Sequence, residues 1–124
     1  DLPDLLALEE ETFHLIEEPI RSVIRKNFLD DAHLSFERCQ GYWSVTYLSA
    51  LIARIHFGPK VSYLSLDAQL AKKLLDQAGL PYSIKPSEQN FARISLNRPE
   101  DVLPALDIIK TVTQKELDFM PKGV

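Results

Sequence analysis

The chain has few of the residues that mark disulfide-bonded, glycine-loop or membrane proteins. Its 124 residues include one cysteine and four glycines. The single Cys39 cannot form an intrachain disulfide, which favours a reducing compartment, so we expect a cytoplasmic protein. No apolar run approaches the roughly 18 residues that span a bilayer. The sequence therefore predicts a protein without a membrane partner.

Sequence motifs for catalysis, cofactors and metals are also lacking. There is no Gly-x-Ser-x-Gly elbow, no Gly-x-x-x-x-Gly-Lys-Ser/Thr loop and no Gly-x-Gly-x-x-Gly fingerprint. Glu11 and His14 have the Glu-x-x-His spacing of di-iron bundles, but the motif is not repeated on a second helix. His33 and His56 have no Cys or His partner at zinc-like spacing. We therefore expect no catalytic constellation, no metal and no cofactor.

The net charge of −4 is unevenly distributed along the chain. Residues 1–18 hold no Lys or Arg and seven carboxylates, namely Asp1, Asp4, Glu9, Glu10, Glu11, Glu17 and Glu18. The remainder has 14 basic and 11 acidic residues and is close to +3. This body is compatible with an anionic partner, and the acidic head is interpreted as the solvated start of a helix.

The first 28 residues have a helical pattern. Apolar residues recur mostly every three to five positions, at Leu5, Leu8, Phe13, Ile16, Ile20, Val23 and Ile24. Pro19 interrupts this pattern, and a proline inside a helix costs about 3 kcal/mol. The sequence therefore predicts a kink at Pro19 or, preferably, a second helix over 19–28.

From His33 to Leu66 the period changes to two, which is typical of strands. Gln40-Gly41 separates the first two strands, and Gly58-Pro59-Lys60 separates a third strand over 51–57 from a fourth over 61–66. The pattern predicts two consecutive hairpins.

The remaining elements are bounded by helix caps and prolines. Asp67 and Gly79 have the positions of an N-cap and a left-handed C-terminal residue. Short strands over 82–85 and 91–96 follow. A last helix is expected to open at Asn97 or Arg98 with Pro99 in its first turn, and Pro104 predicts a kink or a later start. The tail, 120–124, is expected to fray.

This order of helices, four strands, helix, two strands and helix predicts the α+β class. We expect a mostly antiparallel sheet of five or six strands with helices packed on one face. The chain, 1–124, is interpreted as a single domain. It would comprise an acidic helical lead-in over 1–18, a body over 19–119 and the tail.

Alternation within the strands assigns side chains to the two faces of the sheet. If Ala53, Ile55 and Phe57 face the helices, Arg54 and His56 face away from them. The same argument places further polar and aromatic side chains on the outer face, namely Tyr42, Ser44, Thr46, Phe91, Arg93 and Ser95. Arg54, His56, Arg93, Ser95 and Tyr42 are therefore the candidate binding residues, because guanidinium groups suit phosphate or acidic groups.

The run Phe91-Ala92-Arg93-Ile94-Ser95-Leu96 leads through Arg98-Pro99-Glu100-Asp101-Val102 into the final helix. In this order of elements the chain resembles small bacterial accessory domains and, distantly, the YjbR-like group. The resemblance covers residues 20–115 in outline. It implies a frataxin-like α+β fold and an association with DNA binding, and it assigns no functional residue.

Three functional hypotheses follow. The first is a non-enzymatic binding or accessory module, part of a larger bacterial protein, that binds nucleic acid or another anionic ligand through the outer sheet face. The second is a small hydrolase or nuclease-like enzyme with His56 as general acid and base, which requires a carboxylate or second histidine within hydrogen-bond reach. The third is a homodimerisation domain, with the arginines at the rim of the interface.

Overall fold

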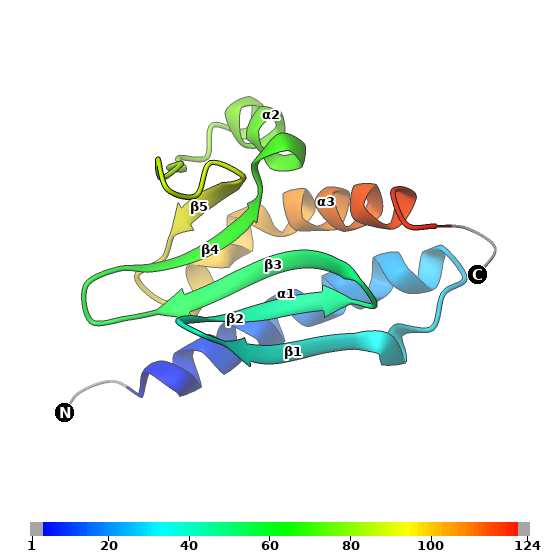
Figure 1. The fold of residues 1–124 in the computed structure, drawn as a ribbon, viewed down its shortest axis with the longest axis horizontal. Helices are drawn as coiled ribbons and strands as arrows, with labels where there is room; N and C mark the ends of the chain where they lie inside the picture. The colour runs from blue at the N-terminus through cyan, green and yellow to red at the C-terminus, as the bar shows by residue number, and fades with distance from the viewer. Residues whose placement is uncertain (1–3, 122–124) are drawn as a thin grey trace.

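A five-stranded antiparallel sheet organises the computed structural model, which describes residues 4–121 (Figure 1). The strands lie in chain order from β1 to β5, so each pairs with its sequence neighbours. The elements are α1 (Leu5–Lys26), η1 (Asp31–His33), β1 (Leu34–Cys39), β2 (Tyr42–Tyr47), β3 (Ala50–Phe57), β4 (Ser62–Asp67), α2 (Ala68–Ala78), β5 (Phe91–Ser95), η2 (Pro99–Ala105) and α3 (Leu106–Asp118). The predicted α+β class is confirmed.

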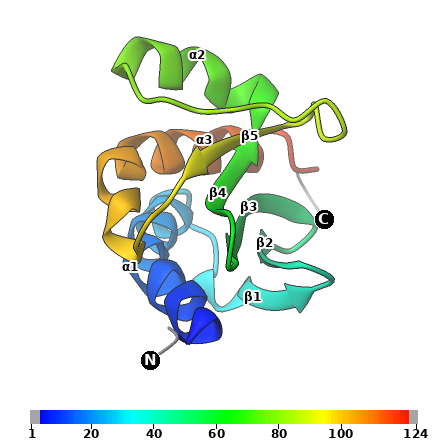
Figure 2. The same cartoon turned by 90° about the vertical axis from the view of Figure 1, so that its left-hand side faces the viewer.

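Helices α1 and α3 cover one face of the sheet, and the opposite face of β1 to β3 carries no helix of residues 4–121 (Figure 2). The core lies between the helices and the sheet. Its fully buried side chains come from the strands and from all three α-helices, and include Ile16, Ile20, Ile24, Val45, Ile55, Leu64, Leu75 and Ile109. This one-sided cover leaves the other face available for polar residues.

Helix α1 runs without interruption from Leu5 to Lys26 and contains Pro19 in its interior. The prediction of a second helix starting at Pro19 is therefore wrong, and so is the boundary drawn between 18 and 19. Buried Phe13 and Ile16 precede the proline, and buried Ile20 and Val23 follow it on the same packed stripe. Burial of that stripe along the sheet offsets the loss of one backbone hydrogen bond.

The two hairpins form as the alternating pattern predicts. Gly41 turns the chain between β1 and β2 with φ of 88°, a left-handed conformation that favours glycine. The turn between β3 and β4 is closed by a hydrogen bond of 3.0 Å from the Gly58 amide to the Val61 carbonyl oxygen. The register between β2 and β3 shifts at Val45 and Thr46.

Helix α2 has the predicted caps. The Asp67 side chain accepts a hydrogen bond from the Leu70 amide, and Gly79 ends the helix with φ of 68°. The strand expected over 82–85 is wrong, because only Ser83 pairs with the sheet, through a bridge to Arg93. Pro81 and Pro86 flank this segment and lack amide protons, so neither can extend the pairing.

The C-terminal region begins as a 3-10 helix, η2, before α3 starts at Leu106. This is the later start that Pro104 predicts. The Asp101 carboxylate accepts hydrogen bonds from the amides of Asn97 and Arg98 and so fixes the entry to η2. Of the expected tail, 122–124 lies outside the described residues. No helix within residues 4–121 is long and apolar enough to cross a bilayer.

Candidate functional site

We call the surface opposite α1 and α3 the open face. Along β3, Ala53, Ile55 and Phe57 are buried in the core, whereas Arg54 and His56 are only partly covered. The same alternation on β2, β4 and β5 gives the open face Tyr42, Ser44, Thr46, Tyr63, Ser65, Phe91, Arg93 and Ser95. The structure thus places all five candidate binding residues on one side of the sheet.

A row of polar residues crosses this face from strand to strand. Ser44 is the register partner of Arg54, which in turn is the partner of Ser65. Ser65 is also the partner of Arg93, and Arg93 pairs with Ser83 in the loop before β5. We call Ser44, Arg54, Ser65, Arg93 and Ser83 the polar row. It brings the two arginines to either side of one buried serine.

The Arg54 side chain is held between two aromatic rings. Its Cζ lies 4.0 Å from the ring centroid of Phe91 and 4.4 Å from that of Tyr42. Cation–π contacts of this kind are worth about 0.5–1 kcal/mol each at exposed sites. Within residues 4–121, the Arg54 guanidinium has no hydrogen bond and no ion pair. It is therefore a positioned cation without an intramolecular counter-ion.

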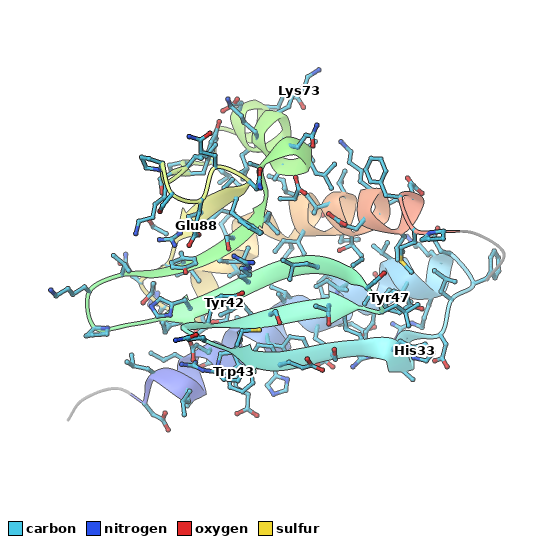
Figure 3. The ribbon with its side chains drawn as sticks, in the orientation of Figure 1. His33, Tyr42, Trp43, Tyr47, Lys73 and Glu88 are labelled. Atoms are coloured by element: carbon cyan, nitrogen blue, oxygen red, sulfur yellow. The ribbon has the colours of Figure 1, made fainter. Side chains whose placement is uncertain are left out.

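Arg93 is positioned by one aromatic ring and one carboxylate. Its Cζ lies 3.9 Å from the ring centroid of Tyr63, and its Nη2 donates a 3.1 Å hydrogen bond to Glu88. The Arg93 side chain is 11% exposed. Glu88 belongs to the loop before β5, and Figure 3 labels it together with Tyr42 of β2. Glu88 neutralises Arg93, so Arg54 supplies the uncompensated charge.

Four buried side-chain atoms of the described residues have no hydrogen-bond partner, and all four belong to the open face. They are Arg54 Nε, His56 Nδ1, Ser65 Oγ and Arg93 Nε. Ser65 is 1% exposed. Leaving a buried donor or acceptor unpaired costs about 1–3 kcal/mol. Their concentration in one place distinguishes the open face from the rest of the fold.

Tyr63 provides a neutral hydroxyl beside these groups. Burial raises the pKa of Tyr63 above its usual range, and the positive charges of Arg93 and Arg54 only partly offset this rise. The phenol therefore stays protonated at neutral pH and can donate a hydrogen bond.

His56 does not form an acid–base pair. The Glu9 carboxylate lies nearby, but its Oε2 is 3.9 Å from His56 Nδ1, beyond hydrogen-bond distance. The Nε2 side of the ring is also confined, because a Cβ on Gly58 would lie 2.6 Å from Nε2. The ring packs against Tyr63 with a centroid separation of 5.3 Å. This geometry gives no support to general acid–base chemistry at His56.

Glu9 is the polar residue whose role differs most from the sequence-based interpretation. It was assigned to a solvated acidic helix start, yet it is 1% exposed. Its carboxylate accepts hydrogen bonds from the indole of Trp43 at 2.8 Å, the amide of Phe57 at 2.9 Å and the guanidinium of Arg38 at 3.1 Å. Strand β2 starts only at Tyr42, so the pairing between β2 and β3 does not reach Phe57. The Glu9 carboxylate accepts the hydrogen bond of the Phe57 amide instead. Glu9 thus ties α1 to the sheet.

The arrangement also bears on the dimer and metal alternatives. Arg54 lies on β3, the middle strand of the sheet, and Arg93 lies on the edge strand β5, so the dimer hypothesis stays a prediction. His14 lies near Glu10 and Glu17 of its own helix. Across residues 4–121, no three His, Cys, Asp or Glu side chains gather in a way that could hold a metal ion.

Comparisons with known proteins leave the site to be judged on this geometry. No family model, no curated protein and no solved structure matches the chain.

Proposed function

We propose that this domain is a non-enzymatic binding module that recognises an anionic group through its open face, with Arg54 as the principal contact. One observation carries the proposal. Arg54 is fixed between Tyr42 and Phe91, yet its guanidinium has no counter-ion or hydrogen-bond acceptor within the described residues. Fixing a long cationic side chain costs conformational entropy, and an incoming anion would use the resulting geometry.

The contacts with the rings leave part of the Arg54 guanidinium free for a ligand. Its Cζ lies over the rings of Tyr42 and Phe91, and its Nε is buried, whereas Nη1 and Nη2 are not among the buried unpaired atoms of the described residues. Phosphate and carboxylate oxygens accept from such a fork in pairs. Arg93 and the Tyr63 hydroxyl are further donors beside Arg54. A compact oxyanion is therefore the ligand class that suits the row.

A single anionic group suits this face better than an extended nucleic acid. The rings of Tyr42, Phe91 and Tyr63 already stack on arginines, so they are poor platforms for bases. Glu88 neutralises Arg93, and Glu37 continues the polar row on β1 as the register partner of Ser44. A face with little net positive charge lacks the electrostatic footprint of a polyanion site.

The test compares the wild type with the Arg54→Ala/Arg93→Ala double variant by isothermal calorimetry. Phenyl phosphate and N-acetylaspartate are the compact probes, and a single-stranded dT oligonucleotide is the polyanionic one. We expect saturable binding of a compact probe by the wild type and at least tenfold weaker binding by the double variant. Arg98→Ala is the matched control, because Arg98 is 74% exposed and forms its ion pairs with Glu100 and Asp101 of η2.

Arg54→Lys separates charge from geometry. Lysine keeps the positive charge but lacks the planar fork, so we expect binding between that of the wild type and that of the double variant. Equal affinity of the wild type and the double variant for both compact probes would reject the proposal. Binding of the oligonucleotide alone, with a steep salt dependence, would favour nucleic acid instead.

A further inference from the structure

The outer edge of β5 carries backbone groups that the fold leaves unpaired. In the bridge between Ser83 and Arg93, the Arg93 amide donates to the Ser83 carbonyl at 2.8 Å and the Ser83 amide donates to the Arg93 carbonyl at 2.9 Å. The Arg93 amide and carbonyl therefore point away from β4. In an antiparallel pair this orientation repeats every second residue, so the same groups of Ser95 also point outward.

The described part of the chain leaves these groups of Ser95 unpaired. Extending the Ser83–Arg93 register by two residues brings Pro81 opposite Ser95. Proline has no amide proton, so it cannot donate to the Ser95 carbonyl. Within residues 4–121, the outward-pointing amide and carbonyl of Ser95 form no backbone hydrogen bond. The bridge consequently stops at Ser83, and the edge is open at Ser95.

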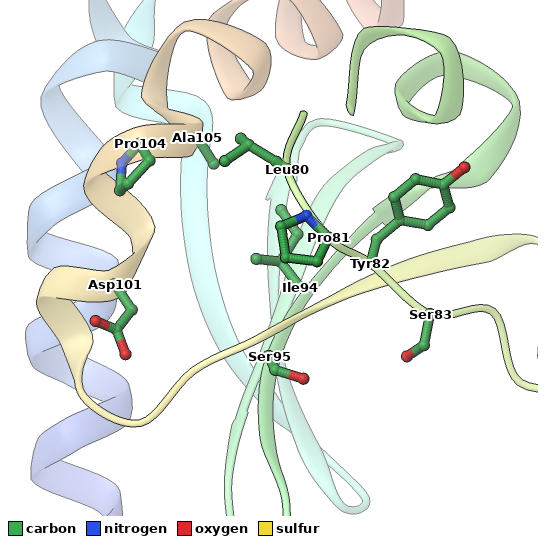
Figure 4. A pocket seen from close by; sticks show the side chains of 9 residues that line it. All are labelled: Leu80, Pro81, Tyr82, Ser83, Ile94, Ser95, Asp101, Pro104 and Ala105. Carbon is green, nitrogen blue, oxygen red and sulfur yellow. The ribbon is translucent and has the colours of Figure 1, made fainter. Parts of the chain in front are cut away.

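A cavity of about 280 Å³ lies at this open edge, between β5, η2 and the Leu80–Ser83 segment. Its walls are mostly apolar, with Leu80, Pro81, Ile94, Pro104 and Ala105 among the lining residues. Figure 4 shows Leu80, Pro104 and Ala105 gathered on one side, while Asp101, Ser95 and Ser83 place their oxygens along the other. The cavity thus joins an apolar hollow to an unpaired backbone edge.

We infer that this edge binds a short extended peptide. The peptide backbone exchanges hydrogen bonds with the amide and carbonyl of Ser95, as an added strand does at a sheet edge. One aliphatic side chain of the peptide occupies the cavity above Ile94 and Ala105. This site borders the polar row at Ser83 but involves neither arginine side chain.

The lining and the charge of the cavity favour this occupant. Its volume of about 280 Å³ lies near the lower end of the range of about 300–1,000 Å³ that is typical of ligand pockets. Its mostly apolar walls suit an aliphatic side chain. Asp101 is the charged residue among those that line it. Its Oδ2 accepts hydrogen bonds from the Asn97 and Arg98 amides, which offset part of its negative charge. The remaining charge disfavours acidic ligands, so the peptide is neutral or basic next to its aliphatic anchor. The edge and the anion site therefore differ in the charge that they accept.

The test uses backbone amide NMR with N-acetyl-leucine N-methylamide, and N-acetyl-aspartate N-methylamide as the acidic counterpart. We expect the leucine probe to shift the amides of Ser95 and Ile94 saturably and to slow hydrogen exchange at Ser95. The aspartate probe should bind at least tenfold more weakly. Arg54→Ala/Arg93→Ala should leave the leucine effect unchanged, which keeps this result separate from the test of anion binding.

Two variants at one position test the backbone contact. Ser95→Pro removes the outward amide, and a proline is tolerated at an edge position whose amide faces out of the sheet. It should abolish the leucine effect, whereas Ser95→Ala keeps the amide and should retain the effect. Binding that persists in a folded Ser95→Pro variant would overturn the inference. Should that variant not fold, wild-type shifts that map away from Ser95, or no shifts at all, would overturn it equally.

Discussion

Two polar clusters of the sheet use buried charge in opposite ways. At the start of β2, the carboxylate of Glu9 is 1% exposed and accepts three hydrogen bonds, from Arg38, Trp43 and Phe57. In the polar row, Arg54, Ser65 and Arg93 each have a buried atom that finds no hydrogen-bond partner among residues 4–121. The first cluster satisfies its polar groups within the chain, and the second leaves several of them to another molecule.

The difference separates a structural cluster from a binding one. A buried polar group that is fully hydrogen-bonded adds to the stability of one conformation, and losing a partner destabilises it. A positioned but unpaired group costs stability in the free protein and gains its partner on binding. Stability measurements on the two clusters should therefore differ in size and in sign.

The largest effect is expected at Glu9. Glu9→Ala leaves the partly buried indole of Trp43 and the buried amide of Phe57 without acceptors, which should lower the free energy of unfolding by about 2–5 kcal/mol. Urea denaturation measures this loss, and Glu10→Ala on the exposed side of α1 is the control. A loss at Glu9 no larger than that at Glu10 would remove the distinction between the clusters.

A smaller effect is expected at Arg54. Arg54→Leu removes the unpaired Nε and two cation–π contacts but keeps an apolar side chain between the rings. These terms oppose each other, so the free energy of unfolding should change by no more than about 1 kcal/mol. Urea denaturation and calorimetry together should show preserved stability with lost anion binding. A destabilisation as large as that of Glu9→Ala would make Arg54 a structural residue.

How far the sequence could predict this arrangement depends on the element. Alternation predicts that Arg54 and Arg93 share a face, because the period of two follows directly from strand geometry. Glycine and proline positions predict the hairpin turns, and Asp67 and Gly79 predict the caps of α2. Whether the helix continues through Pro19 could not be predicted in this way. The helix is held together there by burial of α1 against a sheet whose strands lie further along the sequence.

Glu9 and Ser65 were missed for different reasons. Glu9 lies four positions before Phe13 and seven before Ile16, in phase with the apolar stripe of α1, and that spacing was the available signal. Ser65 lies between Leu64 and Leu66 in an ordinary alternating strand pattern. Only the register of β3, β4 and β5 shows that it has an arginine on either side.

Two buried serines of the polar row sharpen the comparison at the level of single hydroxyls. Ser65 Oγ has no hydrogen-bond partner in the described part of the chain, so Ser65→Ala should leave the free energy of unfolding unchanged or raise it by a few tenths of a kcal/mol. The Ser44 hydroxyl contacts Cys39 Sγ at 3.2 Å, so Ser44→Ala should lower it by about 0.5–1 kcal/mol. Urea titrations of the two variants measure both changes, and a larger loss of stability in Ser65→Ala than in Ser44→Ala would contradict this prediction.

The smallest effect is a pH dependence away from both clusters. Burial raises the pKa of Glu116, and the nearby negative charge of Asp67 raises it further. A raised pKa means that Glu116 contributes stability while it is protonated, below its unfolded pKa, and that this stability is lost as the pH rises through the folded pKa. Glu116→Gln should therefore raise the melting temperature at pH 7 and change it little near pH 3. Equal shifts at both pH values would exclude this titration as the cause.

The arginine side chains report most directly on the central claim. In an NMR titration with phenyl phosphate and N-acetylaspartate, observed at the arginine Nε–H groups, we predict that at least one probe shifts Arg54 and Arg93 saturably. Arg98 should stay constant, and Arg54 should shift most because its guanidinium has no counter-ion within residues 4–121. Uniform small shifts of all arginines with both probes, or no shift at Arg54 with either, would contradict the assignment of the open face as an anion-binding surface.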